Sequence, residues 1–207
     1  MMNTIITLNE ENRKLKLDLL KQQIPPHFVF NSLNNIYSMV QKIDKDVASY
    51  VMKFSELIRY SIYESINEKV SLKKEINFLS NYIGLERVRH NPRRVRIEFI
   101  QIGEVSNIGI PPLMLLELVE NAFKHGINKS HEMSSIFVKI KVKSKRLILI
   151  VLNSTPIQNI LLKGNIIGGI GLKNLKNRLE LFYSKKHTLT LQIGENRYIS
   201  VLTIDLG

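Results

Sequence analysis

One histidine of this chain stands in a setting that suits nucleophilic chemistry. His27 directly follows two prolines, and the apolar residues after it recur at helical spacing up to Val40. Proline is tolerated in the first turn of a helix, where its missing N–H group would have no partner. Asn31 follows one turn later on the same face. A histidine beside a proline bend is more often structural, so a catalytic role needs support from elsewhere in the chain.

Polar residues of four kinds gather on one predicted helix about ninety positions downstream. Within the segment 117–126, Glu117, Asn121, Lys124 and His125 recur at spacings of three and four. Burying a carboxylate, an amide, an ammonium and an imidazole together is costly without a ligand. The set suits a magnesium-bound polyphosphate, because the amide oxygen is a hard ligand and the lysine offsets phosphate charge. The alternative is a solvated polar face. We expect this helix to start in the proline segment 110–116, with its buried stripe at Leu113, Leu116, Val119 and Phe123.

A glycine-rich segment opens a third predicted helix. Three glycines fall within four residues, at 168, 169 and 171, and apolar residues then recur at helical spacing from Leu172. Glycine lets a backbone approach an anion closely, and a helix N-terminus offers free N–H groups to it. The segment does not fit the Walker or the dinucleotide-binding pattern, and taken alone it is equally a flexible turn.

In this order and spacing the three motifs resemble the LytS-like class of sensor histidine kinases. Residues 26–34 are similar to its phosphoacceptor motif Pro-His-Phe-Leu-Phe-Asn-x-Leu-Asn, with valine at position 29. Residues 111–126 resemble its nucleotide-binding helix, and residues 168–174 resemble its glycine loop. The resemblance runs from about residue 15 to the end of the chain.

The resemblance implies an α+β protein. Residues 1–67 would form a helical hairpin that dimerises into a four-helix bundle for phosphotransfer. Residues 68–207 would form an α/β sandwich ATP-binding domain of the gyrase, Hsp90, histidine kinase and MutL type. The implied cofactors are ATP and Mg²⁺, and the implied partners are a second copy of the chain and the receiver domain of a response regulator.

The resemblance also implies roles for individual residues. His27 would take the γ-phosphoryl group of ATP, with Asn31 orienting the ring or a water molecule. Asn121 would bind magnesium, and Glu117 is the polar residue one turn before it. The other implied ATP-binding residues are Lys124, His125, Asn153, Gly169, Gly171 and Leu172.

Two positions depart from common patterns. The superfamily places Asp-x-Gly where this chain has Asn153-Ser154-Thr155, so the adenine would be read by a neutral amide. Many histidine kinases carry an acid directly after the phosphoacceptor, whereas this chain has Phe28, a feature that the LytS-like class shares. The first departure leaves the ATP affinity open, and the second leaves the proton acceptor unnamed.

Three functions fit these residues. The favoured one is a sensor histidine kinase of a two-component system, which phosphorylates itself on a histidine and passes the group to an aspartate. The alternatives are an ATPase of the same superfamily, which would not require His27, and a catalytically weak scaffold, which only Asn153 favours. Family members usually carry a membrane or sensory segment upstream, so we expect a cytoplasmic kinase core tethered to the inner face of the membrane.

The amino-acid composition excludes some kinds of site and argues against one kind of partner. The 207 residues include no cysteine, which excludes disulfides and thiolate metal sites. The net charge of +12 is spread over several clusters without a groove-reading module, so we expect no nucleic-acid partner.

Periodicity predicts the order of the elements. The expected helices are 8–40 with a break at the prolines, 44–66 capped by Asp44, and 71–88 capped by Ser71. On the second helix, Val47, Val51, Phe54, Leu57 and Ile58 should face inward in the bundle. The expected strands are 95–102, 136–142, 147–153, 188–193 and 199–206. Residues 154–167 have little periodicity and lie where the resembled fold has its ATP lid.

Overall fold

The computed structural model describes residues 25–105, 108–127, 133–154, 169–194 and 196–207. The chain divides into two compact units, Met1–Ser55 and Glu56–Gly207, which are described separately. None of the helices in the described ranges combines the length and the apolar character needed to cross a bilayer. The expected helix before Pro25 and the expected lid at 155–168 lie outside the described residues.

The first unit is a helical hairpin. Helix α2 (Pro26–Val40) begins with proline in its first turn, as expected. Helix α3 (Lys45–Arg59) is capped by Asp44, whose carboxylate accepts hydrogen bonds from the backbone N–H groups of Asp46 (2.8 Å) and Val47 (3.1 Å). Its line of apolar residues at 47, 51, 54 and 58 is not buried within the single chain. That these residues face inward in a bundle stays a prediction.

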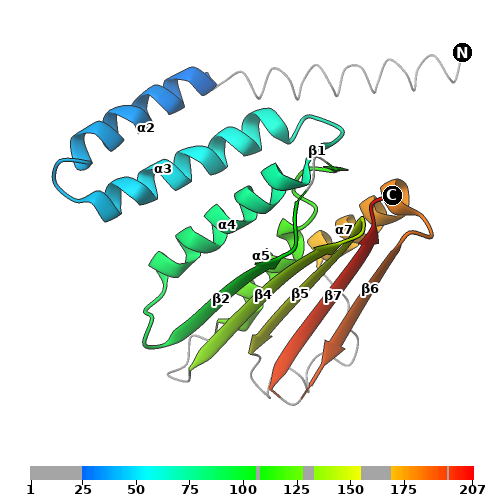
Figure 1. Ribbon diagram of the computed structural model, residues 1–207. Helices are drawn as coiled ribbons and strands as arrows, with labels where there is room; N and C mark the ends of the chain where they lie inside the picture. The colour runs from blue at the N-terminus through cyan, green and yellow to red at the C-terminus, as the bar shows by residue number, and fades with distance from the viewer. Residues whose placement is uncertain (1–24, 106–107, 128–132, 155–168, 195) are drawn as a thin grey trace, which may run out of the picture. The chain divides into compact units, whose positions relative to one another are not determined.

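A mixed five-stranded sheet forms the base of the second unit (Figure 1). In spatial order its strands are β2 (Val95–Ile102), β4 (Ser134–Lys143), β5 (Arg146–Ser154), β7 (Arg197–Asp205) and β6 (His187–Ile193). The pair β2 and β4 is parallel, and the other neighbours are antiparallel. All five strands that the sequence predicts are present. Residues facing the helices alternate along β4 with residues on the open side, and the former are buried.

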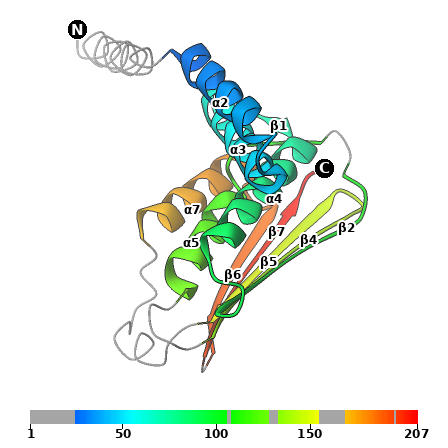
Figure 2. The same cartoon turned by 90° about the vertical axis from the view of Figure 1, so that its left-hand side faces the viewer.

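Three helices cover one face of this sheet, and no helix of the described residues in this unit lies on the other face (Figure 2). They are α4 (Leu72–Arg89), α5 (Leu116–Gly126) and α7 (Ile170–Tyr183). A short ladder of β1 (Val70–Ser71) with β3 (Gly109–Ile110) lies outside the main sheet. The hydrophobic core fills the layer between helices and sheet. The predicted α/β sandwich is therefore confirmed, whereas pairing of the hairpin into a four-helix bundle remains a prediction.

Two helix boundaries differ from the prediction. The second predicted helix was expected to end at residue 66. Its α-helical part ends at Arg59, and a π-helical turn, η1 (Tyr60–Glu64), follows directly. Helix α5, the predicted nucleotide-binding helix, begins at Leu116 and not in the proline segment, because Leu113 has a left-handed backbone (φ 59°) that no α-helix contains.

The buried stripe of α5 is shifted as a consequence. Its fully buried apolar residues are Leu118, Val119, Ala122 and Phe123. The prediction was correct for Val119 and Phe123 but wrong for Leu113 and Leu116, which are only partly buried.

Candidate functional site

His27 lies in the first turn of α2, and its side chain is exposed. The amide nitrogen of Asn31 is 3.2 Å from each of the two ring nitrogens of His27. An amide N–H group donates only to a ring nitrogen that carries a lone pair. The amide group of Asn31 therefore lies against the edge of the His27 ring. This contact agrees with the predicted position of Asn31 one turn after the histidine.

Glu117 and Gly171 bring α5 and α7 together. A Cβ atom at Gly171 would lie 2.3 Å from Oε2 of Glu117, so a larger residue would displace the Glu117 carboxylate from its present position. Burial raises the pKa of the Glu117 carboxyl, Glu120 raises it further, and Arg178 acts in the opposite direction. The first turn of α7, whose leading N–H groups have no acceptor within the helix, thus lies beside the polar face of the predicted nucleotide helix.

Asn153 and Gly126 form a second close approach, between β5 and the end of α5. Asn153 is 2% exposed, and its amide nitrogen donates to the carbonyl oxygen of Ser154 at 2.9 Å. A Cβ atom at Gly126 would lie 2.5 Å from the Cβ atom of Asn153. The Ser154 hydroxyl donates to the Gly126 carbonyl and accepts from the Ser135 N–H group, both at 3.0 Å. These bonds fix Asn153 next to the C-terminal end of α5.

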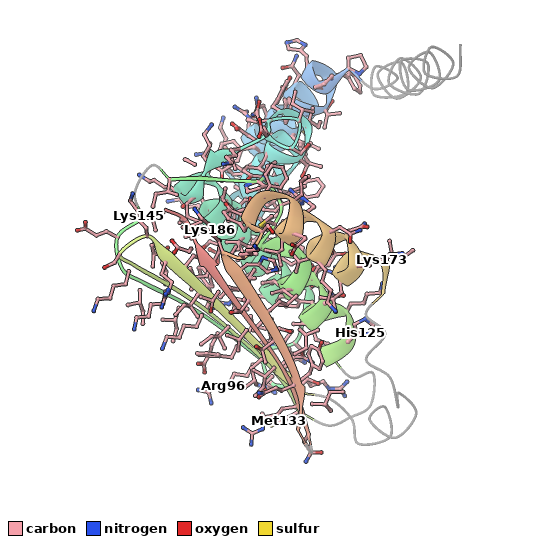
Figure 3. The ribbon with its side chains drawn as sticks, turned by 90° about the vertical axis from the view of Figure 1, so that its right-hand side faces the viewer. Arg96, His125, Met133, Lys145, Lys173 and Lys186 are labelled. Atoms are coloured by element: carbon pink, nitrogen blue, oxygen red, sulfur yellow. The ribbon has the colours of Figure 1, made fainter. Side chains whose placement is uncertain are left out.

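The remaining predicted residues lie along the same two helices. Asn121 is half-buried on α5, one turn after Glu117, and Lys124 and His125 are exposed near the end of that helix. Gly169 is the N-cap residue of α7, and Leu172 is buried. Figure 3 shows His125 near the end of α5 and Lys173 near the start of α7 on the helical side of this unit, away from Lys145. Gly168 lies outside the described residues.

The oxygen atoms available on α5 suit a magnesium ion whose other ligands would be the phosphates of a nucleotide. No group of three or more His, Cys, Asp or Glu side chains that could hold a metal occurs in the described part of the chain. Glu117 and Asn121, however, offer a carboxylate and an amide oxygen one turn apart. Magnesium is commonly bound by one or two such oxygens together with substrate phosphates and water.

A buried cluster that the sequence did not predict holds the segment before α5. The Glu75 carboxylate on α4 accepts hydrogen bonds from the backbone N–H groups of Leu113 (2.9 Å) and Leu115 (3.1 Å). It also accepts a short hydrogen bond from the Tyr60 hydroxyl. Arg178 on α7 donates to the carbonyl oxygen of Pro112 at 2.6 Å. The sequence does contain a signal, since Glu75 falls at helical spacing among the apolar residues 72, 76 and 79, where a charged side chain is unexpected.

Comparison with known proteins identifies the class. The histidine kinase family matches residues 15–94. The sensor histidine kinase YpdA of Escherichia coli is 29% identical over 186 residues, covering 86% of this chain and 32% of its own length. The protein YwpD of Bacillus subtilis is 30% identical, covering 85% and 65%. The sensor protein LytS of Streptococcus agalactiae is 29% identical, covering 91% and 34%.

The chain belongs to the histidine kinases, and among them to the LytS-like class. It spans about a third of the length of YpdA and LytS and about two thirds of YwpD. Among solved structures, the histidine kinase domain of the blue-light activated histidine kinase from Erythrobacter litoralis aligns with 96% of this chain at 15% identity and a TM-score of 0.48.

Proposed function

We propose that this chain is the kinase core of a two-component sensor. It binds ATP with Mg²⁺ in the second unit, transfers the γ-phosphoryl group to His27, and passes it on to an aspartate of a response regulator. The family membership implies ATP use. The roles of individual residues are part of the proposal.

The close approach of Gly171 to Glu117 carries this proposal. It sets the N-terminal turn of a 14-residue helix beside the polar face of α5. Such a turn favours phosphate, because its free N–H groups and the helix dipole both point toward the anion. The phosphates would lie between Gly171 and Asn121, and the adenine toward Asn153 at the end of β5.

The proposed chemistry uses few protein groups. Bound magnesium would neutralise phosphate charge, held by Asn121 with Glu117 nearby. A neutral ring nitrogen of His27 forms the new N–P bond, the bond to the β-phosphate oxygen breaks, and ADP leaves. The imidazole proton is released to water or to a carboxylate.

In the second step the receiver aspartate takes the phosphoryl group, and the P–N bond of phosphohistidine breaks. Homodimerisation and a membrane tether on the cytoplasmic side belong to this proposal as well. A catalytically weak scaffold is the second candidate, since Asn153 gives the base a neutral partner whose amide nitrogen already donates to Ser154.

Autophosphorylation with γ-labelled ATP and Mg²⁺ tests the proposal. We expect acid-labile, base-stable label on the wild type and none on His27→Gln, while both proteins bind nucleotide equally. His187→Gln is the matched control, because the His187 ring contacts the Tyr183 carbonyl (2.7 Å) at the far end of α7. Label that survives in His27→Gln would refute the assignment, and binding without any label on the wild type would favour the scaffold.

A further inference from the structure

The turn that precedes α5 has an unfavourable backbone conformation. Leu113 has φ 59°, a left-handed geometry that brings its Cβ too close to the following carbonyl group. Pro111 and Pro112 have no N–H groups, so few donors are left to hold this segment. Non-glycine residues keep such conformations only where surrounding contacts over-determine them. Those contacts are therefore candidates for setting where α5 begins.

The contacts come from two sides. Glu75 on α4 accepts from the N–H groups of Leu113 and Leu115, one at each carboxylate oxygen. Arg178 on α7 donates to the carbonyl oxygen of Pro112, the residue directly before Leu113. Glu117 stands two residues beyond Leu115 and Asn121 one turn further. The start of the nucleotide helix is thus held by a carboxylate from α4 and a guanidinium from the helix that carries Gly171.

Glu75 is 1% exposed and has three hydrogen-bond donors around it. The two carboxyl oxygens of Glu75 accept all three of these hydrogen bonds. Burial raises the pKa of Glu75, while the hydrogen bonds from Tyr60, Leu115 and Leu113 and the charge of Arg178 lower it. Removing one donor weakens the hydrogen bonds that the other two donors make to Glu75. The reason is that the Glu75 carboxyl group is buried and its hydrogen bonds strengthen one another.

The third donor, the Tyr60 hydroxyl, connects Glu75 to the segment that continues α3. Tyr60 opens η1, which continues α3 without a break, and its ring packs on Phe78 of α4 with 4.4 Å between ring centroids. A rotation or shift of α3 would move the Tyr60 hydroxyl relative to Glu75, because the backbone is continuous between them and α3.

We propose that Tyr60 and Glu75 are positioning residues that couple α3 to the nucleotide site, by controlling the turn at 113–115 from which α5 begins. This inference rests on the proposed function, since it assumes that α5 binds nucleotide. The hydrogen bond from Tyr60 holds the Glu75 carboxylate against the turn. When α3 moves and this bond opens, the turn loosens, and Glu117 and Asn121 lose their alignment with the phosphates.

The test measures binding of a non-hydrolysable ATP analogue with Mg²⁺ by calorimetry, on the full chain. We expect Glu75→Gln to weaken binding about tenfold, because an amide NH₂ group would face one of the two backbone donors, and Tyr60→Phe to weaken it about threefold. The double variant should bind no worse than Glu75→Gln, since the two residues act through one contact. Tyr183→Phe is the matched control, because among the described residues its buried hydroxyl has no hydrogen-bond partner.

Hydrogen exchange separates coupling from a merely structural role. At saturating analogue, the amides of 60–64 should exchange more slowly than in the free wild type, because linkage between two sites is reciprocal. In Glu75→Gln this protection should be lost although the site is filled. Equal protection in both proteins, or independent effects of Tyr60→Phe and Glu75→Gln on affinity, would overturn the inference. A wild type that binds no nucleotide would instead refute the proposed function.

Discussion

The two units of this chain bury their apolar residues to very different degrees. In the second unit, buried residues of α4, α5 and α7 meet those of the sheet in one continuous core. In the helical hairpin, only Phe30, Ala48 and Ser55 are buried among the described residues, and Ile43 is 85% exposed. The second unit therefore has the interior of an independent domain, whereas the described part of the hairpin exposes apolar residues that the proposed dimer would cover.

This difference separates the parts of the proposed reaction. His27 stands exposed on the hairpin, where its described side-chain partner is Asn31. Glu117, Gly171 and Asn153 lie on elements that the core of the second unit holds in place. The proposed phosphoacceptor is thus exposed, while the proposed nucleotide-binding groups are held in place by packing.

The largest expected effect would come from charging the exposed apolar line of α3. Val47→Asp combined with Phe54→Asp should convert the dimer into a monomer, because each carboxylate would be buried without a partner in the bundle. We expect a dissociation constant at least roughly 100-fold higher, from a cost of about 3 kcal/mol or more. Sedimentation velocity at several concentrations measures the change.

Ser49→Asp on the same helix is the control, since Ser49 is polar and exposed. It should leave the dimer intact. If the double variant remains dimeric, the hairpin does not associate through this line of residues.

An intermediate effect should follow from opening the core of the second unit. Leu179 is 0% exposed and Leu181 is 76% exposed on the same helix, α7. Leu179→Ala should lower the free energy of unfolding by about 2–5 kcal/mol, because it leaves a cavity. Leu181→Ala should change it by less than about 0.5 kcal/mol. Urea unfolding followed by circular dichroism distinguishes the two.

The urea experiment also sharpens the contrast between the units. The Leu179→Ala loss should not depend on protein concentration, because this core belongs to a single chain. A cost that disappears at high concentration would mean that the second unit, too, depends on a partner.

The smallest expected effect concerns Asn153. Asn153→Asp should tighten ATP binding several-fold, since a charge-assisted hydrogen bond to the adenine amino group is stronger by about 1 kcal/mol. The same substitution should reduce stability, because the Asn153 amide now donates to the Ser154 carbonyl and a carboxylate cannot. Asn153→Leu should weaken ATP binding and its preference over GTP. Calorimetry on the three proteins decides, and identical affinities would mean that Asn153 does not contact the base.

Much of the fold was predictable from local patterns. Alternation of apolar residues gave all five strands of the sheet, and Asp44 and Ser71 marked the starts of their helices because their side chains cap free N–H groups. The start of α5 was not predictable, because a Pro-Pro-Leu segment is compatible with a helix until distant residues hold Leu113 in a left-handed conformation.

The candidate site was predictable in its parts but not in its contacts. The spacing of Glu117 and Asn121 put both on one helical face, and the glycines near 171 suggested close approach. The sequence did not say what Gly171 approaches, which is Glu117, or that Gly126 packs against Asn153. Both contacts join residues far apart in the chain, so no local pattern contains them.

By itself, the sequence determined the motifs, their order and the elements that carry them, because helix and strand periodicity and capping act over a few residues. Tertiary structure alone decided where α5 begins and what holds that start. Glu75 reaches Leu113 and Leu115 across 38 and 40 positions, and Arg178 reaches Pro112 across 66. Hydrogen bonds at such separation exist only once α4, α5 and α7 have packed on the sheet, because burial among these elements is what makes them stable.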